Sequence, residues 1–87
     1  MDKVYDFYSD AGHGWLRVPK KDLTELKIAD KISEYSYING ASAYLEEDSD
    51  LTIFMDAYKK KYGTLPELRE HNVDGESRIR SYQHYMG

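Results

Sequence analysis

The residues best suited to chemistry lie in one short segment near the start of the chain. Asp10, His13 and Trp15 fall within six positions, separated by Gly12 and Gly14. A histidine oriented by a carboxylate can act as a general base, and an indole ring can form the wall of a site. In the favoured interpretation, however, the segment is a hairpin turn, in which the two glycines supply positive φ and the histidine is solvated. A catalytic site would also need a third group and a concave surface.

An acidic segment in the middle of the chain is the second candidate site. Between positions 44 and 57 there are five acids and no Lys or Arg, whereas the rest of the chain carries 11 acids and 12 bases. The segment lacks the spacing and central glycine of an EF-hand loop, so we predict no metal site. Helix capping is the favoured interpretation, and the alternative is a surface that binds a basic protein. The residues expected to face such a partner are Glu46, Glu47, Asp48 and Asp50, together with Tyr82.

Tyrosines and two arginines complete the set of candidate contact residues. Nine tyrosines in 87 residues is a high content, and tyrosine suits both half-buried sheets and interfaces. Arg78 and Arg80 could clamp an anion, because guanidinium groups bind such oxygens bidentately. We favour pairing of these arginines with the acidic segment of the same chain. Four tyrosines are expected to cover a sheet (Tyr5, Tyr35, Tyr37 and Tyr44), and two are expected to be freer for contacts (Tyr82 and Tyr85).

Composition and missing motifs narrow the classes of function. The chain contains no cysteine, no Gly-rich phosphate loop, no nucleophile elbow and no paired-His motif, and we predict no cofactor. A net charge of −4 and scattered bases do not give the basic surface that binds a phosphate backbone, so we predict no direct nucleic-acid binding. No apolar run reaches the length of about 18 residues typical of a membrane span, and the first residues lack a signal-peptide pattern. We therefore expect no membrane association and a cytoplasmic location.

The glycine-rich segment is expected to connect two strands. Residues 4–9 alternate in period two, and residues 15–18 are predicted to form the returning strand. Pro19 ends that strand, since it has no N–H, and is well placed to open a short helix over 20–27.

A second hairpin is predicted around Asn39-Gly40, the strongest turn signal in the sequence. Residues 32–38 and 41–45 form its strands, and this dipeptide favours a type I′ turn. The predicted pairs are Ile38 with Ala41 and Tyr35 with Tyr44.

An amphipathic helix over residues 51–62 is the most regular element, and Gly63 is its predicted stop. Residues 67–73 could add an edge strand, and residues 77–85 are expected to form a short helix or irregular segment that packs back on the sheet. We thus predict one α+β domain over residues 1–87, with a small antiparallel sheet of two hairpins and two helices, in the order β-β-α-β-β-α-(β).

Four stretches of the chain carry a resemblance: Tyr8–Leu16 (with DAGHGWL), Ile32-Ser33 with Tyr35–Tyr37 (YSY), Tyr44–Asp48 (YLEED) and Ile79-Arg80 with Tyr82. They resemble a family of small uncharacterised proteins carried by bacteriophages, plasmids and other mobile elements. The resemblance covers nearly the whole chain and implies a genomic setting, but no catalytic residue. Ser49 departs from it, since a cysteine is expected there, and this weakens a functional role for that position.

Three functional hypotheses follow, and the first leads. It is a non-enzymatic interaction module of a mobile element, such as an anti-CRISPR or anti-restriction inhibitor, whose acidic segment covers a basic nucleic-acid-binding surface of a host enzyme. The second is a small enzyme or ligand-binding protein that uses Asp10, His13 and Trp15 with Arg80, although nothing specific argues for an enzyme. The third is an accessory module that self-associates through a sheet edge or its tyrosines.

Overall fold

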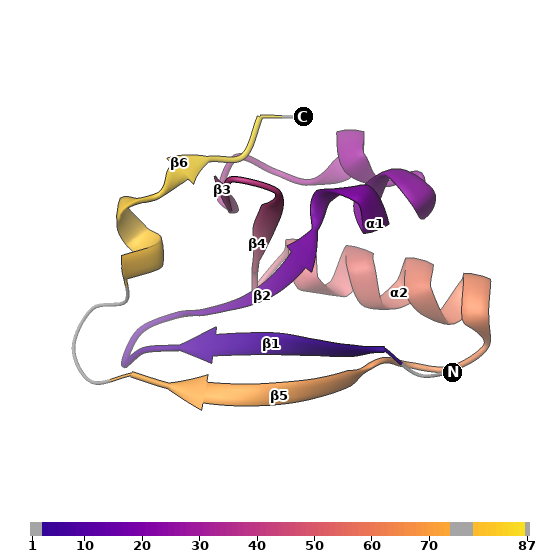
Figure 1. Cartoon of the computed structure of the whole chain (residues 1–87), viewed down its shortest axis with the longest axis horizontal. Helices are drawn as coiled ribbons and strands as arrows, with labels where there is room; N and C mark the ends of the chain where they lie inside the picture. Colours follow the sequence, from indigo (N-terminus) through magenta and orange to yellow (C-terminus); the bar gives the residue numbers. More distant parts are fainter. Residues whose placement is uncertain (1–2, 74–77, 87) are drawn as a thin grey trace.

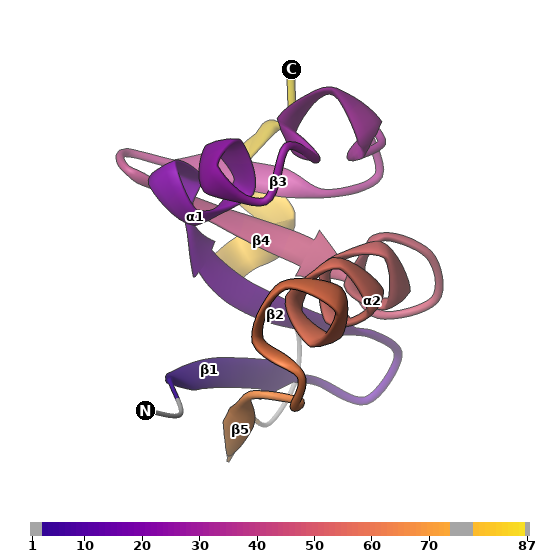
Figure 2. The same cartoon turned by 90° about the vertical axis from the view of Figure 1, so that its right-hand side faces the viewer.

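Six strands form one mixed sheet, and two α-helices cover one of its faces (Figure 1, Figure 2). The computed structural model describes residues 3–73 and 78–86, with the strands in the order β5-β1-β2-β4-β3-β6. Along the chain the elements are β1 (Val4–Ser9), β2 (Gly14–Pro19), α1 (Lys20–Glu25), the 3₁₀ helix η1 (Ala29–Lys31), β3 (Tyr37–Asn39), β4 (Ser42–Glu46), α2 (Asp50–Tyr62), β5 (Glu67–Asn72), the 3₁₀ helix η2 (Arg78–Ser81) and β6 (Gln83–His84).

The first hairpin, the long helix and the edge strand are found within one residue of their predicted bounds, whereas the helix after Pro19 ends at Glu25 and not at residue 27. The prediction of an antiparallel sheet made of two hairpins alone is wrong, because β5 pairs with β1 in parallel and β6 adds a further strand. The parallel pairing follows from the path of α2, which returns the chain to the point where β1 begins (Figure 1). There the backbone N–H of Glu67 donates to the carbonyl of Lys3, so β5 must run beside β1 in the same direction.

The second hairpin has a different register from the one predicted. Tyr37 lies opposite Tyr44 and Asn39 lies opposite Ser42, so the two-residue turn is Gly40-Ala41. Gly40 has a φ of 63° and Ala41 has no positive φ, which is the pattern of a type II′ turn and excludes the predicted type I′ turn.

The strand predicted over residues 32–38 is limited to β3. Residues 32–36 are irregular, so the predicted pairing of Tyr35 with Tyr44 is wrong, and the Tyr35 side chain is 70% exposed.

The C-terminal segment packs back on the sheet as expected. It forms η2 and then pairs through β6 with β3, and the backbone N–H of Tyr85 donates to the carbonyl of Ser36. Ser77, the first residue of the predicted segment, lies outside the described residues. Tyr85, expected to be free for contacts, is buried.

The alternation of side chains separates two clusters on the two faces of the sheet. Leu16 and Leu45 belong to the larger cluster, under α1 and α2, whereas their neighbours Trp15 and Tyr44 belong to a smaller cluster with Ile79 of η2. The sheet face opposite the helices is therefore aromatic and partly covered by the C-terminal segment.

A buried carboxylate, that of Asp50, holds the irregular stretch between η1 and β3. Asp50 is the first residue of α2 and is 1% exposed, and it accepts hydrogen bonds from the backbone N–H and hydroxyl of Ser33 and from the hydroxyl of Ser36. The Ser36 hydroxyl in turn accepts the N–H of Glu46, at 2.9 Å. One carboxylate thus joins α2, the 33–36 stretch and the end of β4.

Removal of the Asp50 carboxylate should lower the free energy of unfolding. Asp50→Ala leaves the buried hydroxyl of Ser36 and the partly buried donors of Ser33 without this acceptor, so we expect a loss of about 2–3 kcal/mol in the free energy of unfolding. Urea denaturation measures it, with Asp56→Asn, an exposed acid on the same helix, as the control that changes stability by less than about 0.5 kcal/mol. Equal stability of the two variants would contradict this role of Asp50.

A surface ion pair joins the two parallel strands. Asp6 of β1 lies opposite Arg69 of β5, and its Oδ1 is 2.8 Å from Arg69 Nε and 3.0 Å from His71 Nε2. The hydrogen bond from the Arg69 guanidinium, with that from His71, lowers the pKa of Asp6 from its ordinary value of 3.8 to about 2.

This shift predicts a specific dependence of stability on pH. Because the folded pKa is the lower one, the carboxylate stabilises the fold above about pH 4, and this contribution is lost as the pH falls towards 2. Asp6→Asn should lower stability at pH 7 and shrink the fall between pH 4 and pH 2, as measured by urea denaturation at each pH. If the stability of this variant falls as much between pH 4 and pH 2 as that of the original protein, Asp6 does not cause the fall.

Candidate partner-binding pocket

A concave pocket of about 380 Å³ lies at the edge of the aromatic sheet face. Residues of both candidate sites, the glycine-rich segment and the acidic segment, line it. Trp15 at the start of β2 lies opposite Glu46 at the end of β4, so the sheet register places the indole ring beside the acidic segment. We call this hollow the acidic–aromatic pocket. Its lining residues are His13, Trp15, Tyr35, Tyr37, Glu46, Asp48, Ser49 and Arg80.

Aromatic rings form one side of this pocket. The Trp15 ring lies 6.3 Å from the Tyr37 ring, in an edge-on arrangement, and 5.9 Å from the His13 imidazole. Tyr35 reaches the pocket because the bonds to Asp50 keep residues 33–36 out of the strand. Sequence reasoning missed Tyr35 and Tyr37 as site residues because it assigned both to a continuous strand.

A partly buried ion pair connects the glycine-rich turn to the C-terminal segment. The Asp10 carboxylate accepts Nε of Arg80 at 2.8 Å and a terminal nitrogen of Arg80 at 3.0 Å. The Arg80 guanidinium lies 5.6 Å from the centre of the Trp15 ring. The prediction that Arg80 pairs within the protein is confirmed, but the carboxylate described here is that of Asp10 and not one of the acidic segment.

The same carboxylate shapes the turn itself. Asp10 Oδ1 also accepts the backbone N–H groups of Gly12 and His13, at 3.0 and 2.9 Å. These bonds and the two from Arg80 occupy both carboxylate oxygens, and none of the four comes from the imidazole of His13. His13 is exposed, so the geometry does not give it the oriented carboxylate that a general base requires.

Three of the four predicted acids are accessible, and one is not. Glu47 and Asp48 are exposed and Glu46 is half-buried, and we call these three residues the acidic rim. Glu46 and Asp48 line the pocket, whereas Glu47 does not and lies close to Gly14. Asp50 is buried and cannot reach a partner, which corrects its predicted role.

The favoured prediction of simple helix capping is wrong. Ser49 holds the N-cap position of α2 without a capping side-chain bond, because its hydroxyl donates to Glu46 Oε2 at 3.1 Å. Tyr82, predicted as a contact residue, does not line the pocket: it packs on Tyr44 with 5.1 Å between ring centres.

Neither glycine of the turn is required by φ, and only Gly14 is required by space. Neither Gly12 nor Gly14 has a positive φ, which corrects the prediction for both. A Cβ atom on Gly14 would overlap the ring of Phe7, whereas one on Gly12 would meet only a terminal nitrogen of Arg80, at 3.2 Å.

The pair of glycines gives a matched test. Gly14→Ala forces the buried Phe7 ring to move and should cost about 1–3 kcal/mol in the free energy of unfolding. Gly12→Ala should cost clearly less, because a flexible guanidinium can yield. Thermal or urea unfolding of both variants checks the order, and a larger cost at Gly12 would contradict the packing described.

Other kinds of site find no support in the part of the chain that the structure describes. Residues 3–73 and 78–86 contain no group of three or more His, Asp or Glu side chains placed to hold a metal ion. Within the same residues, no helix is long and apolar enough to cross a membrane.

Comparison with known proteins gives no relative. No protein-family model, curated protein or solved structure matches this chain. The function must therefore be argued from the pocket.

Proposed function

We propose that the protein is a non-enzymatic interaction module that binds a basic protein surface through the acidic–aromatic pocket and the acidic rim. The observation that carries this proposal is the meeting of aromatic rings and carboxylates in one hollow, with a guanidinium already stacked in it. Arg80 lies over Trp15, while Glu46 and Asp48 line the same pocket. An arginine or lysine of a partner is the side chain that such a lining favours.

Two kinds of interaction would hold that side chain. A cation near the face of an aromatic ring gains about 0.5–2 kcal/mol, and more when the site is desolvated. Carboxylates at the rim add charge-assisted hydrogen bonds and speed the encounter with a positive surface. The exposed ring of Tyr35 supplies contact area with little loss of side-chain entropy, as is typical of residues that dominate binding energy.

The Trp15 indole adds a polar feature to this lining. The side chain is 2% exposed, and its N–H has no hydrogen-bond partner among the described residues. A buried donor without an acceptor costs about 1–3 kcal/mol. A carbonyl oxygen is the kind of acceptor that this group lacks, so a peptide segment of a partner suits the lining better than a free cation.

The partner class that best matches this chemistry is a protein whose basic surface itself binds nucleic acid. An acidic module of this size would occupy such a surface and exclude the nucleic acid, as an inhibitor of a defence nuclease of a bacterial host would do. The resemblance to proteins of mobile elements is compatible with that role.

Reversal of charge on the rim tests the proposal. Glu47→Lys with Asp48→Lys changes two exposed residues, and it should weaken binding about tenfold or more and reduce its dependence on salt. The tagged protein is used to retain partners from a bacterial lysate at low and high salt, with mass spectrometry of the retained proteins. The matched control is Glu67→Lys with Glu70→Lys on the exposed edge strand β5, which changes net charge equally.

Two results decide the matter. A stoichiometric basic partner that the control retains and the rim variant loses supports the proposal. Retention of the same partner by both variants, or no basic partner at either salt concentration, would contradict it.

A further inference from the structure

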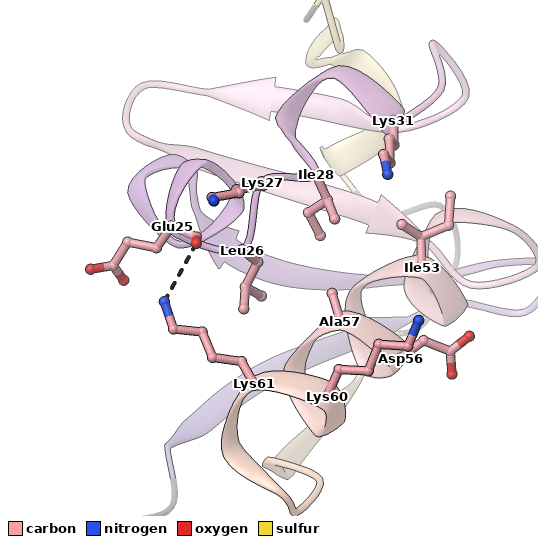
Figure 3. A pocket seen from close by; sticks show the side chains of 10 residues that line it. All are labelled: Glu25, Leu26, Lys27, Ile28, Lys31, Ile53, Asp56, Ala57, Lys60 and Lys61. Carbon is pink, nitrogen blue, oxygen red and sulfur yellow. Dashed lines mark hydrogen bonds between the residues drawn. The ribbon is translucent and has the colours of Figure 1, made fainter.

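A larger groove, of about 650 Å³, lies on the helix face, between the α1–η1 segment and α2 (Figure 3). It is separate from the acidic–aromatic pocket and shares no lining residue with it. We propose that this groove, here called the lysine groove, binds an acidic amphipathic helix of a protein partner. The proposal goes beyond the function proposed above and does not depend on it.

The floor of the lysine groove is apolar. Leu26 and Ile28 contribute from one wall and Ile53 and Ala57 from α2, and three of these four side chains are partly buried against the core with the rest of their surface open. The lining positions on α2 run from residue 53 to residue 61 at helical spacing, which makes a straight stripe about 12 Å long. Two turns of a second helix could lie along it with apolar residues at i, i+3 and i+4.

The rim of the groove is positive, although the whole chain is negative. Lys27 and Lys31 stand on one wall and Lys60 and Lys61 on the other, against two lining acids, Glu25 and Asp56 (Figure 3). Lys61 Nζ donates to the carbonyl of Glu25 at 3.4 Å and so bridges the walls at one end. The other three ammonium groups make no hydrogen bond or ion pair to any residue within 3–73 and 78–86, and so they can receive the carboxylates of a ligand.

The backbone at Lys27 also indicates a role for its side chain. Lys27 has a φ of 60°. Its N–H donates to the backbone carbonyl of Thr24, and the N–H of Ile28 donates to that of Leu23. These two bonds form a Schellman motif at the end of α1. Glycine is preferred at this position because a Cβ atom is strained there. The chain places a lysine where glycine would fit better, and that lysine lies on the rim of the groove.

An acidic helix fits these features better than the other anionic partners. A nucleic acid would not use the apolar floor, and phosphate recognition favours the bidentate guanidinium, which the rim lacks. An anionic membrane would favour apolar side chains that protrude into it, whereas here they are recessed between two helical walls.

The test uses a fluorescein-labelled peptide of 14 residues with leucines at i, i+3, i+4 and i+7 and glutamates elsewhere, followed by anisotropy. We expect saturable binding that weakens at least tenfold with a peptide in which glutamine replaces glutamate. Lys31→Glu with Lys60→Glu should lose binding to a similar degree. Glu47→Lys with Asp48→Lys should bind normally, which separates this proposal from the function proposed above.

Lys27→Gly distinguishes a binding role from a structural one. Because glycine relieves the strained backbone, the melting temperature should stay equal or rise, while the peptide binds several-fold more weakly. Absence of saturable binding, or equal binding by the Lys31/Lys60 variant, would overturn the proposal. Tighter lysine-dependent binding to phosphatidylglycerol vesicles or to a 20-base-pair DNA than to the peptide would also overturn it.

Discussion

The carboxylate of Asp50 is the constraint on which the rest of the structure depends. It is buried at the start of α2, where the helix dipole favours a negative charge, and its described partners are the hydroxyls and one backbone N–H of two serines. A buried charge is tolerated only when its hydrogen bonds are satisfied, so Ser33 and Ser36 must stay where the carboxylate holds them. Residues 33–36 therefore cannot extend β3, and Tyr35 is turned outward into the acidic–aromatic pocket. Arg80, which is bonded to Asp10, also lines this pocket.

The sheet divides the charge of the molecule between two faces. Alternation along β2 and β4 directs Leu16 and Leu45 to the helices and Trp15 and Glu46 to the other side. Asp48 lines the same pocket as Trp15 and Glu46, and the lysine groove lies among the helices. A net charge of −4 thus conceals two surfaces of opposite character, and each favours a partner of opposite charge. This separation is the physical reason why we propose two separate contact surfaces.

Local patterns in the sequence predicted most of the elements and named five residues that line the pocket, but they did not predict that these residues lie together. Period-two alternation, the position of Pro19 and the apolar face of α2 depend on neighbouring residues, so they could be recognised without the fold. The register of the second hairpin could not, because Ser36 is fixed by Asp50 and this overrides the preference of Asn39-Gly40 for a type I′ turn. The Asp10–Arg80 pair joins residues 70 positions apart, and no spacing rule reveals such a contact. Likewise, the composition of an acidic segment does not indicate which of its side chains is buried.

The most direct test of the account follows the emission of Trp15, the only tryptophan in the chain, during titration with hexa-arginine at low and high salt. We predict a saturable change of emission at low salt that is lost at high salt. Asp48→Asn and Tyr35→Ala should weaken it several-fold, and Glu67→Gln with Glu70→Gln should leave it unaltered. Constant emission, or a change that is the same in all variants, would contradict the claim that this pocket receives a basic side chain.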